Sequence, residues 1–223
     1  MLAHNFDLID LSAHHHQVKA NLPVSDSDKI AHEMTVSSKT SIKRKSASAP
    51  LKLLIKKGLI KSESNTKALN YGKGKYSGND DHDTNTLREL YGNCHAYDYT
   101  FAYDKTLLLK GFYNVIYCAY VVNVLPPLAR IEIYKETAAC LAKGVGNSAF
   151  FAARSEKDRG LMTMKAKAEC DGLRTRTGSF QKGYREENDE LLQEAREHFL
   201  YVRYIQKSGA YHLIQASHDP FID

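Results

Sequence analysis

Residues 112–122, FYNVIYCAYVV, constrain the fold most, because this run is almost wholly apolar and rich in aromatic and β-branched side chains. Such a run is typical of a buried β-strand. The apolar stretch continues to Leu128, but Asn114, Asn123 and a proline pair interrupt it, so we do not expect a membrane span. The sequence therefore predicts a strand in the interior of a globular domain.

Shorter segments on both sides of this strand alternate between strand-like and helical patterns. We predict strands at residues 68–71, 94–97, 112–122, 147–153, 199–205 and 211–216, and helices at 51–59, 86–91, 126–142 and 186–198. Alternation of this kind is typical of an α/β fold with a mostly parallel sheet. The last two strands are joined by a glycine-containing turn and predict an antiparallel hairpin at one edge.

The chain of 223 residues has room for one sizeable domain and an extension. Residues 1–38 are predicted to form a polar N-terminal extension, with disorder as one alternative, and residues 39–223 to form the domain. The extension carries the triplet His14-His15-His16. No acidic or cysteine residue stands beside the triplet at ligand spacing, so we expect an exposed triplet and no metal site.

Residues 39–61 hold eight Lys and Arg side chains and no Asp or Glu, within a chain of net charge +5. Leu51, Leu54, Ile55 and Leu59 recur there at helical spacing, which predicts a basic amphipathic helix. Two interpretations stay open. The lysines could contact nucleic-acid phosphates, or they could form a solvated face above an apolar stripe.

The four cysteines, Cys94, Cys118, Cys140 and Cys170, lie far apart without a CxxC pair. This spacing argues against a zinc site and against a disulfide framework, and it favours a reducing, cytoplasmic compartment. The N-terminal residues lack the basic and apolar regions of a signal peptide.

Two glycines follow the first predicted strand, and an acidic residue follows the second. In open α/β sheets, ligands bind outside the carboxyl ends of the strands. Gly72 and Gly74 would let the backbone approach a ligand closely. Asp98 comes 24 residues after Gly74, near the separation of an acid that binds ribose hydroxyls. This pattern predicts a cofactor site, with a structural turn and a solvated Asp98 as the alternative.

The chain resembles the methyltransferases encoded beside DNA phosphorothioation systems, and through them the class I methyltransferase fold. The similar segments are KTSIKRKSASAPLKLLIKKGLI (39–60), LNYGKG (69–74), AYDYTFAYD (96–104), YVVNVLPPLAR (120–130) and DGLRTRTGSFQKGY (171–184). The last segment is the most specific. The resemblance covers about residues 39–216 and implies a Rossmann-like three-layer sandwich that binds S-adenosylmethionine (AdoMet).

The resemblance also implies which residues bind the cofactor. Gly72 and Gly74 would face the methionine part, and Asp98 would hold the ribose. Asn123 and its neighbour Tyr120 would line the cofactor from the side of the strand at 112–122. The resemblance also places Asn70 at the cofactor, although Asn70 stands where the family has Asp, and Lys73 departs from the pattern by placing a cation between the glycines.

Residues 155–185 are long, charged and glycine-containing, and we predict a lid or substrate loop there. Its second half carries side chains that can donate to phosphates or base edges, namely Arg174, Arg176, Gln181, Lys182 and Tyr184. The alternative is a solvated loop.

The sequence therefore predicts an AdoMet-dependent methyltransferase for a nucleic-acid-related substrate, with DNA and proteins of a DNA-modification system as partners. Leu125-Pro126-Pro127-Leu128 has no aromatic residue to stack on a flipped base, and no Pro-Cys nucleophile is present. Neither amino methylation of a base nor cytosine C5 methylation is therefore indicated. The alternative is an inactive methyltransferase fold that binds DNA or protein. A nucleotide-dependent oxidoreductase is weaker, because only two of three fingerprint glycines are available.

Overall fold

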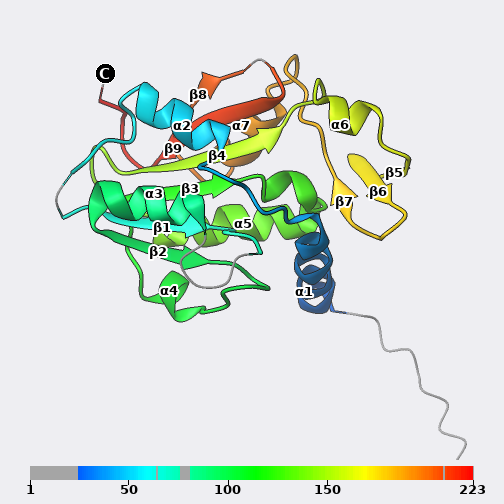
Figure 1. Cartoon of the computed structure of the whole chain (residues 1–223), viewed down its shortest axis with the longest axis horizontal. Helices are drawn as coiled ribbons and strands as arrows, with labels where there is room; N and C mark the ends of the chain where they lie inside the picture. Colours follow the sequence, from blue (N-terminus) through cyan, green and yellow to red (C-terminus); the bar gives the residue numbers. More distant parts are fainter. Residues whose placement is uncertain (1–24, 64, 76–80, 208, 223) are drawn as a thin grey trace, which may run out of the picture.

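A six-stranded sheet with the order β2-β1-β3-β4-β9-β8 forms the centre of the protein (Figure 1). The computed structural model describes residues 25–63, 65–75, 81–207 and 209–222. The strands are β1 (Lys67–Tyr71), β2 (Asn93–Tyr97), β3 (Val115–Ala119), β4 (Ser148–Arg154), β8 (Tyr201–Gln206) and β9 (Tyr211–Ser217). The first four run parallel, whereas β9 runs antiparallel to β4 and β8 antiparallel to β9. The predicted α/β fold with an antiparallel C-terminal hairpin is confirmed.

Strand β1 pairs with both β2 and β3, so the order of strands reverses beside it. Leu69 is in register with His95 of β2 on one side and with Ile116 of β3 on the other. The connections that leave β1 and β3 therefore run to opposite halves of the sheet. Such a reversal opens a crevice at the carboxyl ends of the two strands.

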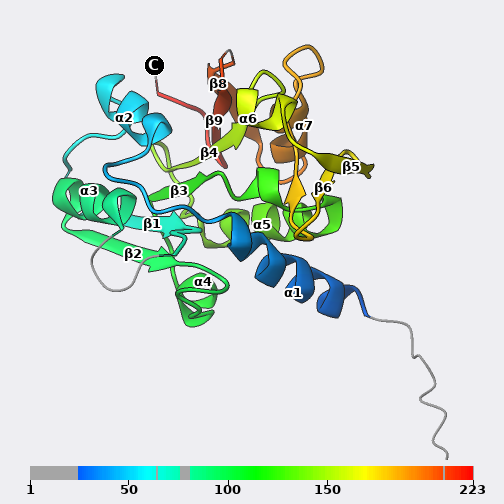
Figure 2. The same cartoon turned by 45° about the vertical axis from the view of Figure 1, so that its right-hand side comes forward.

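Helices cover both faces of this sheet, which gives three layers (Figure 2). On one face, α2 (Ala49–Lys56) and α3 (His82–Tyr91) bury Leu51, Leu54 and Leu87 against alternate sheet residues such as Tyr117. On the other face lie α1 (Asp26–Ser37), α5 (Pro127–Cys140) and α7 (Glu190–Arg196). The remaining short helices are η1 (Ser38–Thr40), α4 (Thr106–Leu109), η2 (Val122–Val124) and α6 (Arg159–Met162).

Strand β3 is shorter than the apolar run that predicted it. Tyr113 and Val122 are fully buried but lie outside β3: Tyr113 bridges to Leu141 at the end of α5, and Val122 begins η2. Phe112 is exposed. The run from 112 to 122 therefore has strand geometry only at its centre, and its first residue faces solvent. Within the described part of the chain, no helix has the length and apolarity needed to cross a membrane.

Part of the predicted N-terminal extension is folded. Ser25 caps α1 by accepting a hydrogen bond from the Asp28 backbone N–H (3.1 Å). Met34 is buried in the core beside α5, and Glu33 accepts two hydrogen bonds from the Arg174 guanidinium, at 2.8 and 2.9 Å. These contacts join α1 to distant parts of the chain. The histidine triplet of the extension lies outside the described residues.

Part of the segment predicted as a lid or substrate loop forms a second, antiparallel sheet. Its strands are β5 (Ala166–Glu169), β6 (Gly172–Thr175) and β7 (Phe180–Gln181), and they stand beside the central sheet in both views (Figures 1 and 2). Phe180 is fully buried, and a Cβ atom at Gly172 would overlap its ring. Because residues 155–185 are mostly polar, their sequence shows no apolar pattern that would predict these short strands.

A network of buried charges joins this second sheet to α5 and α7. The Lys182 ammonium lies 2.6 Å from Asp171 and 3.2 Å from Glu190, and the Arg130 guanidinium contacts both Asp171 and Glu194. Both cationic side chains are only 4% exposed. Burial alone would raise the pKa of Asp171, but hydrogen bonds from Arg130 and Lys182 hold it below its usual range.

We predict that Lys182→Met lowers the free energy of unfolding by about 3 kcal/mol, because it removes a buried cation that contacts three carboxylates and leaves these carboxylates with Arg130 and Arg185. Lys157→Met removes a cation from the exposed pair with Glu186 and should have little effect. Because the folded pKa of Asp171 lies below its unfolded value, the wild-type network stabilises the fold above that unfolded value and loses this contribution as the pH falls. Urea denaturation at pH 7 and pH 3 measures both effects. Equal losses in the two variants would contradict the assignment.

Candidate functional site

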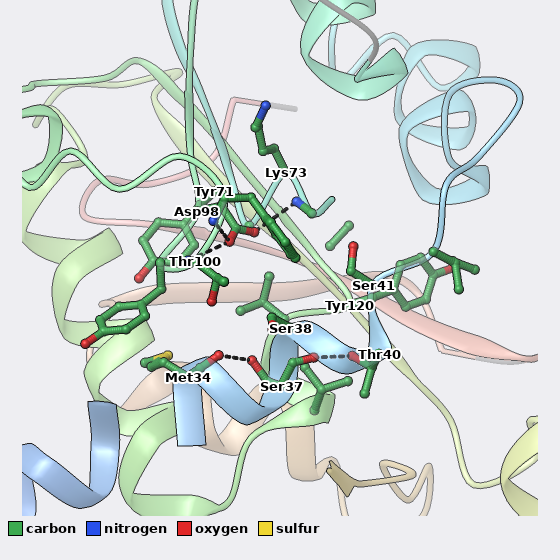
Figure 3. A pocket seen from close by; sticks show the side chains of 18 of the residues that line it. Met34, Ser37, Ser38, Thr40, Ser41, Tyr71, Lys73, Asp98, Thr100 and Tyr120 are labelled. Carbon is green, nitrogen blue, oxygen red and sulfur yellow. Dashed lines mark hydrogen bonds between the residues drawn. The ribbon is translucent and has the colours of Figure 1, made fainter. Parts of the chain in front are cut away.

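A cavity opens at the carboxyl ends of β1, β2 and β3, where the strand order reverses (Figure 3). Its walls come from residues 72–74, 98–101 and 119–121, and residues of α1, η1 and the following segment to Arg44 cover one side. The cavity has a volume of about 120 Å³, and its mouth is open to solvent.

The glycine turn and Asp98 lie side by side at this edge of the sheet. The Gly74 backbone N–H donates to one carboxylate oxygen of Asp98 (2.9 Å), and the N–H groups of Thr100 and Phe101 donate to the other (2.9 and 3.0 Å). The Tyr97 carbonyl accepts from Gly72 at 2.7 Å. The loop after β1 is therefore tied to the end of β2, and the oxygen bonded to Gly74 retains a free lone pair for a further donor.

The two glycines allow the turn to pack closely against other parts of the protein. Gly72 and Gly74 have φ angles of +80° and +79°, which other residues rarely adopt. A Cβ atom at Gly72 would overlap the Val121 side chain, and one at Gly74 would lie 2.7 Å from the Ser41 hydroxyl. Both glycines line the cavity, but the contacts that require them are within the chain.

Asn70 lies outside the cavity lining, contrary to the position that the resemblance implied for it. Its buried amide donates to Asp81 (2.8 Å) and to the Thr84 hydroxyl (2.9 Å). Asp81 is the N-cap of α3 and accepts from the Asp83 backbone N–H. Asn70 therefore anchors α3 to β1. Lys73 lines the cavity, but its side chain points away from the other labelled residues (Figure 3).

Tyr120 forms a wall between this first cavity and a second one. Its φ angle of +63° is unusual for a non-glycine residue, and its N–H donates to the Ala152 carbonyl at 2.7 Å. The Arg44 guanidinium lies over its ring, 5.1 Å from the centroid. Burial raises the pKa of the Tyr120 hydroxyl to about 12, although Arg44 opposes the shift. Both side chains line both cavities.

The second cavity has a volume of about 720 Å³ and lies on the other side of Tyr120. Asn123 lines it and is fully buried, yet neither its amide nitrogen nor its oxygen has a partner among the described residues. An unpaired buried amide is costly, because it has lost its hydrogen bonds to water. This second cavity therefore contains a polar group that lacks a partner.

The structure does not bring the five predicted substrate residues together. Gln181 lines the second cavity, where its side-chain oxygen accepts from Arg154 at 3.0 Å. Arg174 is paired with Glu33 and Glu169, and it lies away from both cavities. Lys182 and Tyr184 belong to the buried network, where the Tyr184 hydroxyl donates to Glu194 at 2.7 Å. Arg176 is exposed and lines neither cavity.

Sequence reasoning missed Arg154 and did not single out Arg44 within the basic segment. Arg154 ends β4 at the same edge of the sheet as the glycine turn, so a charged residue after the predicted strand at 147–153 was the available signal. Among the described residues, no group of three or more His, Cys, Asp or Glu side chains could hold a metal ion.

Neither a protein-family model nor a curated protein matches the chain. Among solved structures, a complex of DhpI with SAH is similar, with a TM-score of 0.52 and 11% identity over 83% of this chain and 95% of that one. An S-adenosylmethionine-dependent methyltransferase from Clostridium acetobutylicum ATCC 824 gives a TM-score of 0.49 and 12% identity over 86% and 100%. The protein has the predicted Rossmann-like methyltransferase fold.

We predict that Gly72→Ala lowers the free energy of unfolding by about 3 kcal/mol, since it combines a positive φ with overlap against Val121. Gly58→Ala is the control: its φ is +70° but nothing lies near the added Cβ, so only about 1 kcal/mol should be lost. Adding Val121→Ala to Gly72→Ala should recover about 1 kcal/mol relative to the sum of the single variants. Additive losses in denaturation would refute the packing explanation.

Asn70→Asp should destabilise the protein and fail to improve cofactor binding, because it places a buried carboxylate against Asp81. The two carboxylates would share a raised pKa in the folded state, so at pH 5 the pair can hold a proton and the loss of stability should be smaller. At pH 8 both carboxylates are charged, and the loss of stability should reach about 3 kcal/mol. The exposed substitution Asn93→Asp serves as the control. Thermal unfolding at the two pH values tests this, and a stability that does not depend on pH would show that the two side chains do not face each other.

Proposed function

We propose that this protein is an AdoMet-dependent methyltransferase, with the cofactor in the first cavity and the methyl acceptor in the second. The observation that carries the proposal is the hydrogen bond between Gly74 and Asp98 at the reversal point of the sheet. It joins the glycine turn to the acidic residue that directly follows β2. The similarity of the fold to the DhpI–SAH complex supports the same site.

The residues that line the first cavity suit the parts of AdoMet. The unshared lone pair of Asp98 would accept a ribose hydroxyl in a charge-assisted hydrogen bond. Tyr99, Phe101 and Val121 supply apolar surface for an adenine ring. The hydroxyls of residues 37–41 and the cation of Arg44 would contact the amino-acid end. When bound, AdoMet supplies a methyl group made electrophilic by its sulfonium.

Alignment of the two ligands is the main task of the chain in this proposal. Tyr120 and Arg44 line both cavities and would position the acceptor against the cofactor. Asn123 lines only the second cavity, so we assign it to the acceptor instead of the cofactor. Met34, Ser37 and Ser38, from α1 and η1, cover the first cavity and would exclude water from it.

We also propose a nucleic-acid-related acceptor, a link to DNA modification and phosphorothioation, and partner proteins of such a system. Three cations of the basic segment, Arg44, Lys45 and Lys52, line the second cavity and support a phosphate-bearing ligand. The link to phosphorothioation rests on the resemblance of residues 69–74, 120–130 and 171–184. A cytoplasmic location is proposed from the four free cysteines.

A second candidate is a catalytically silent protein that uses this fold to bind DNA or protein. The loop after β1 favours it, because the N–H groups of Gly72 and Lys73 both face the Tyr97 carbonyl and the Gly74 N–H faces Asp98. These donors are thus used within the protein, and Asn70 is directed away from the cavity. Cofactor binding separates the two candidates.

We predict that AdoMet and its demethylated product SAH both bind, with dissociation constants at or below about 1 mM. Asp98→Asn should lower the affinity for each of them by about tenfold, because it removes one charged acceptor. Asp104→Asn alters a neighbouring carboxylate that bonds Thr106 and does not line the cavity, so binding should be unchanged. Isothermal titration calorimetry gives the three affinities. Absence of binding would favour the silent protein, and an unchanged affinity in Asp98→Asn would remove Asp98 from the site.

A further inference from the structure

We infer that the second cavity binds a small molecule with a phosphate or carboxylate group at one end and an uncharged polar group at the other. Only the statement that this molecule is the methyl acceptor rests on the proposed function. Three independent features of the cavity carry the inference: the charge of its walls, a helix N-terminus that opens into it, and the unpaired amide of Asn123.

Cationic side chains outnumber acidic ones in the walls of the cavity. Arg44, Lys45, Lys52 and Arg154 line it, and Asp158 is its one acidic lining residue among the described positions. Asp158 is already bonded by Arg154, at 2.7 and 3.1 Å. The positive charge of Lys45 and Lys52 is therefore not neutralised within the cavity. A recess with an excess of positive charge raises the local concentration of anions.

The N-terminus of α2 faces the same space. Residues 46–49 line the cavity, and α2 begins at Ala49 without a hydrogen bond from a side chain of its N-cap residue Ser48. The Ser48 hydroxyl is bonded to Tyr117 instead. The first backbone N–H groups of a helix carry partial positive charge and bind anions readily. Here the Ser48 N–H is already bonded to Asp83 at 2.7 Å and Pro50 has no N–H, which leaves the N–H groups of Ala49 and Leu51 for a ligand. Lys52, one turn further along α2, adds its ammonium to this end of the cavity.

Asn123 indicates the other end of the ligand. Its amide can donate from nitrogen and accept at oxygen, and both atoms are buried without a partner in the described chain. A neutral amide favours a ligand group that both donates and accepts, such as a hydroxyl or an amide. Asn123 lies next to Val124, which lines both cavities.

The distribution of the other cations favours a small molecule over a nucleic-acid duplex. Lys56 and Lys57 are exposed near the end of α2 and do not line the cavity. Arg174 and Lys182, which the sequence offered as phosphate contacts, are held in ion pairs with Glu33 and Asp171 and do not line the cavity. Within the basic segment, the cations that line the recess are therefore Arg44, Lys45 and Lys52, a set of the size that one phosphate group needs.

The test compares two double variants with the same change in net charge. Lys45→Glu with Lys52→Glu alters the cavity, whereas Lys56→Glu with Lys57→Glu alters exposed positions near the other end of α2. Backbone amide spectra of the full chain are titrated with inorganic phosphate, UMP, uridine and a short DNA duplex, each with and without saturating SAH. Inorganic phosphate reports the anion site alone, and uridine is the neutral counterpart of UMP.

We expect UMP and phosphate to shift the amides of residues 45–49 and 120–123 in a saturable way, and uridine to bind about tenfold more weakly than UMP. The affinity for UMP should fall by about tenfold in the cavity variant and by about twofold at most in the control variant. Equal binding of uridine and UMP, equal losses in both variants, or binding of the duplex but not of UMP would each overturn the inference. If the wild-type protein binds UMP but does not bind SAH, the proposed function is overturned and the inference about the second cavity stands.

Discussion

The pairing of β1 with strands on both of its sides is the constraint on which the rest of the structure depends. Because β2 and β3 flank β1 in parallel, the three strand ends converge on one edge of the sheet. The turn after β1 can then reach the turn after β2, and Gly74 donates to Asp98. A different order of strands would separate these two segments. The position of the cavity and of its proposed cofactor site follows from this topology.

The most specific sequence motif has mainly a structural role. In residues 171–184, Asp171, Lys182 and Tyr184 form the buried network with Arg130 and Glu194. The motif thereby fixes β7 next to η2, where the Lys182 N–H donates to the Asn123 carbonyl at 2.7 Å. This contact helps to hold Asn123 at the wall of the second cavity. The motif residues thus act on the proposed acceptor site by positioning it, and Gln181 alone among the five predicted residues lines it.

Local patterns predicted the sheet well, and distant contacts explain what they missed. Strand β1 is indicated by the short apolar run at 68–71. The end of α3 is indicated by Gly92, which adopts a φ of +72° in the structure. Both signals lie within a few residues of the element that they predict. Helix α1 has a weakly amphipathic sequence, and it is held by contacts with α5 and Arg174 that are far away in the chain. Donor-rich side chains such as Lys182 resemble ligand-binding groups until their acidic partners are located in space.

Tyr120 connects the two cavities physically, and its backbone explains how. The chain leaves β3 and must enter η2 within a few residues, so Tyr120 takes a left-handed conformation that is stabilised by the Ala152 carbonyl of β4. This turn directs the ring between the cavities, where Arg44 covers it. A ligand in either cavity would contact the same two side chains. Binding in one cavity is therefore expected to change the affinity of the other, because both ligands order the same pair.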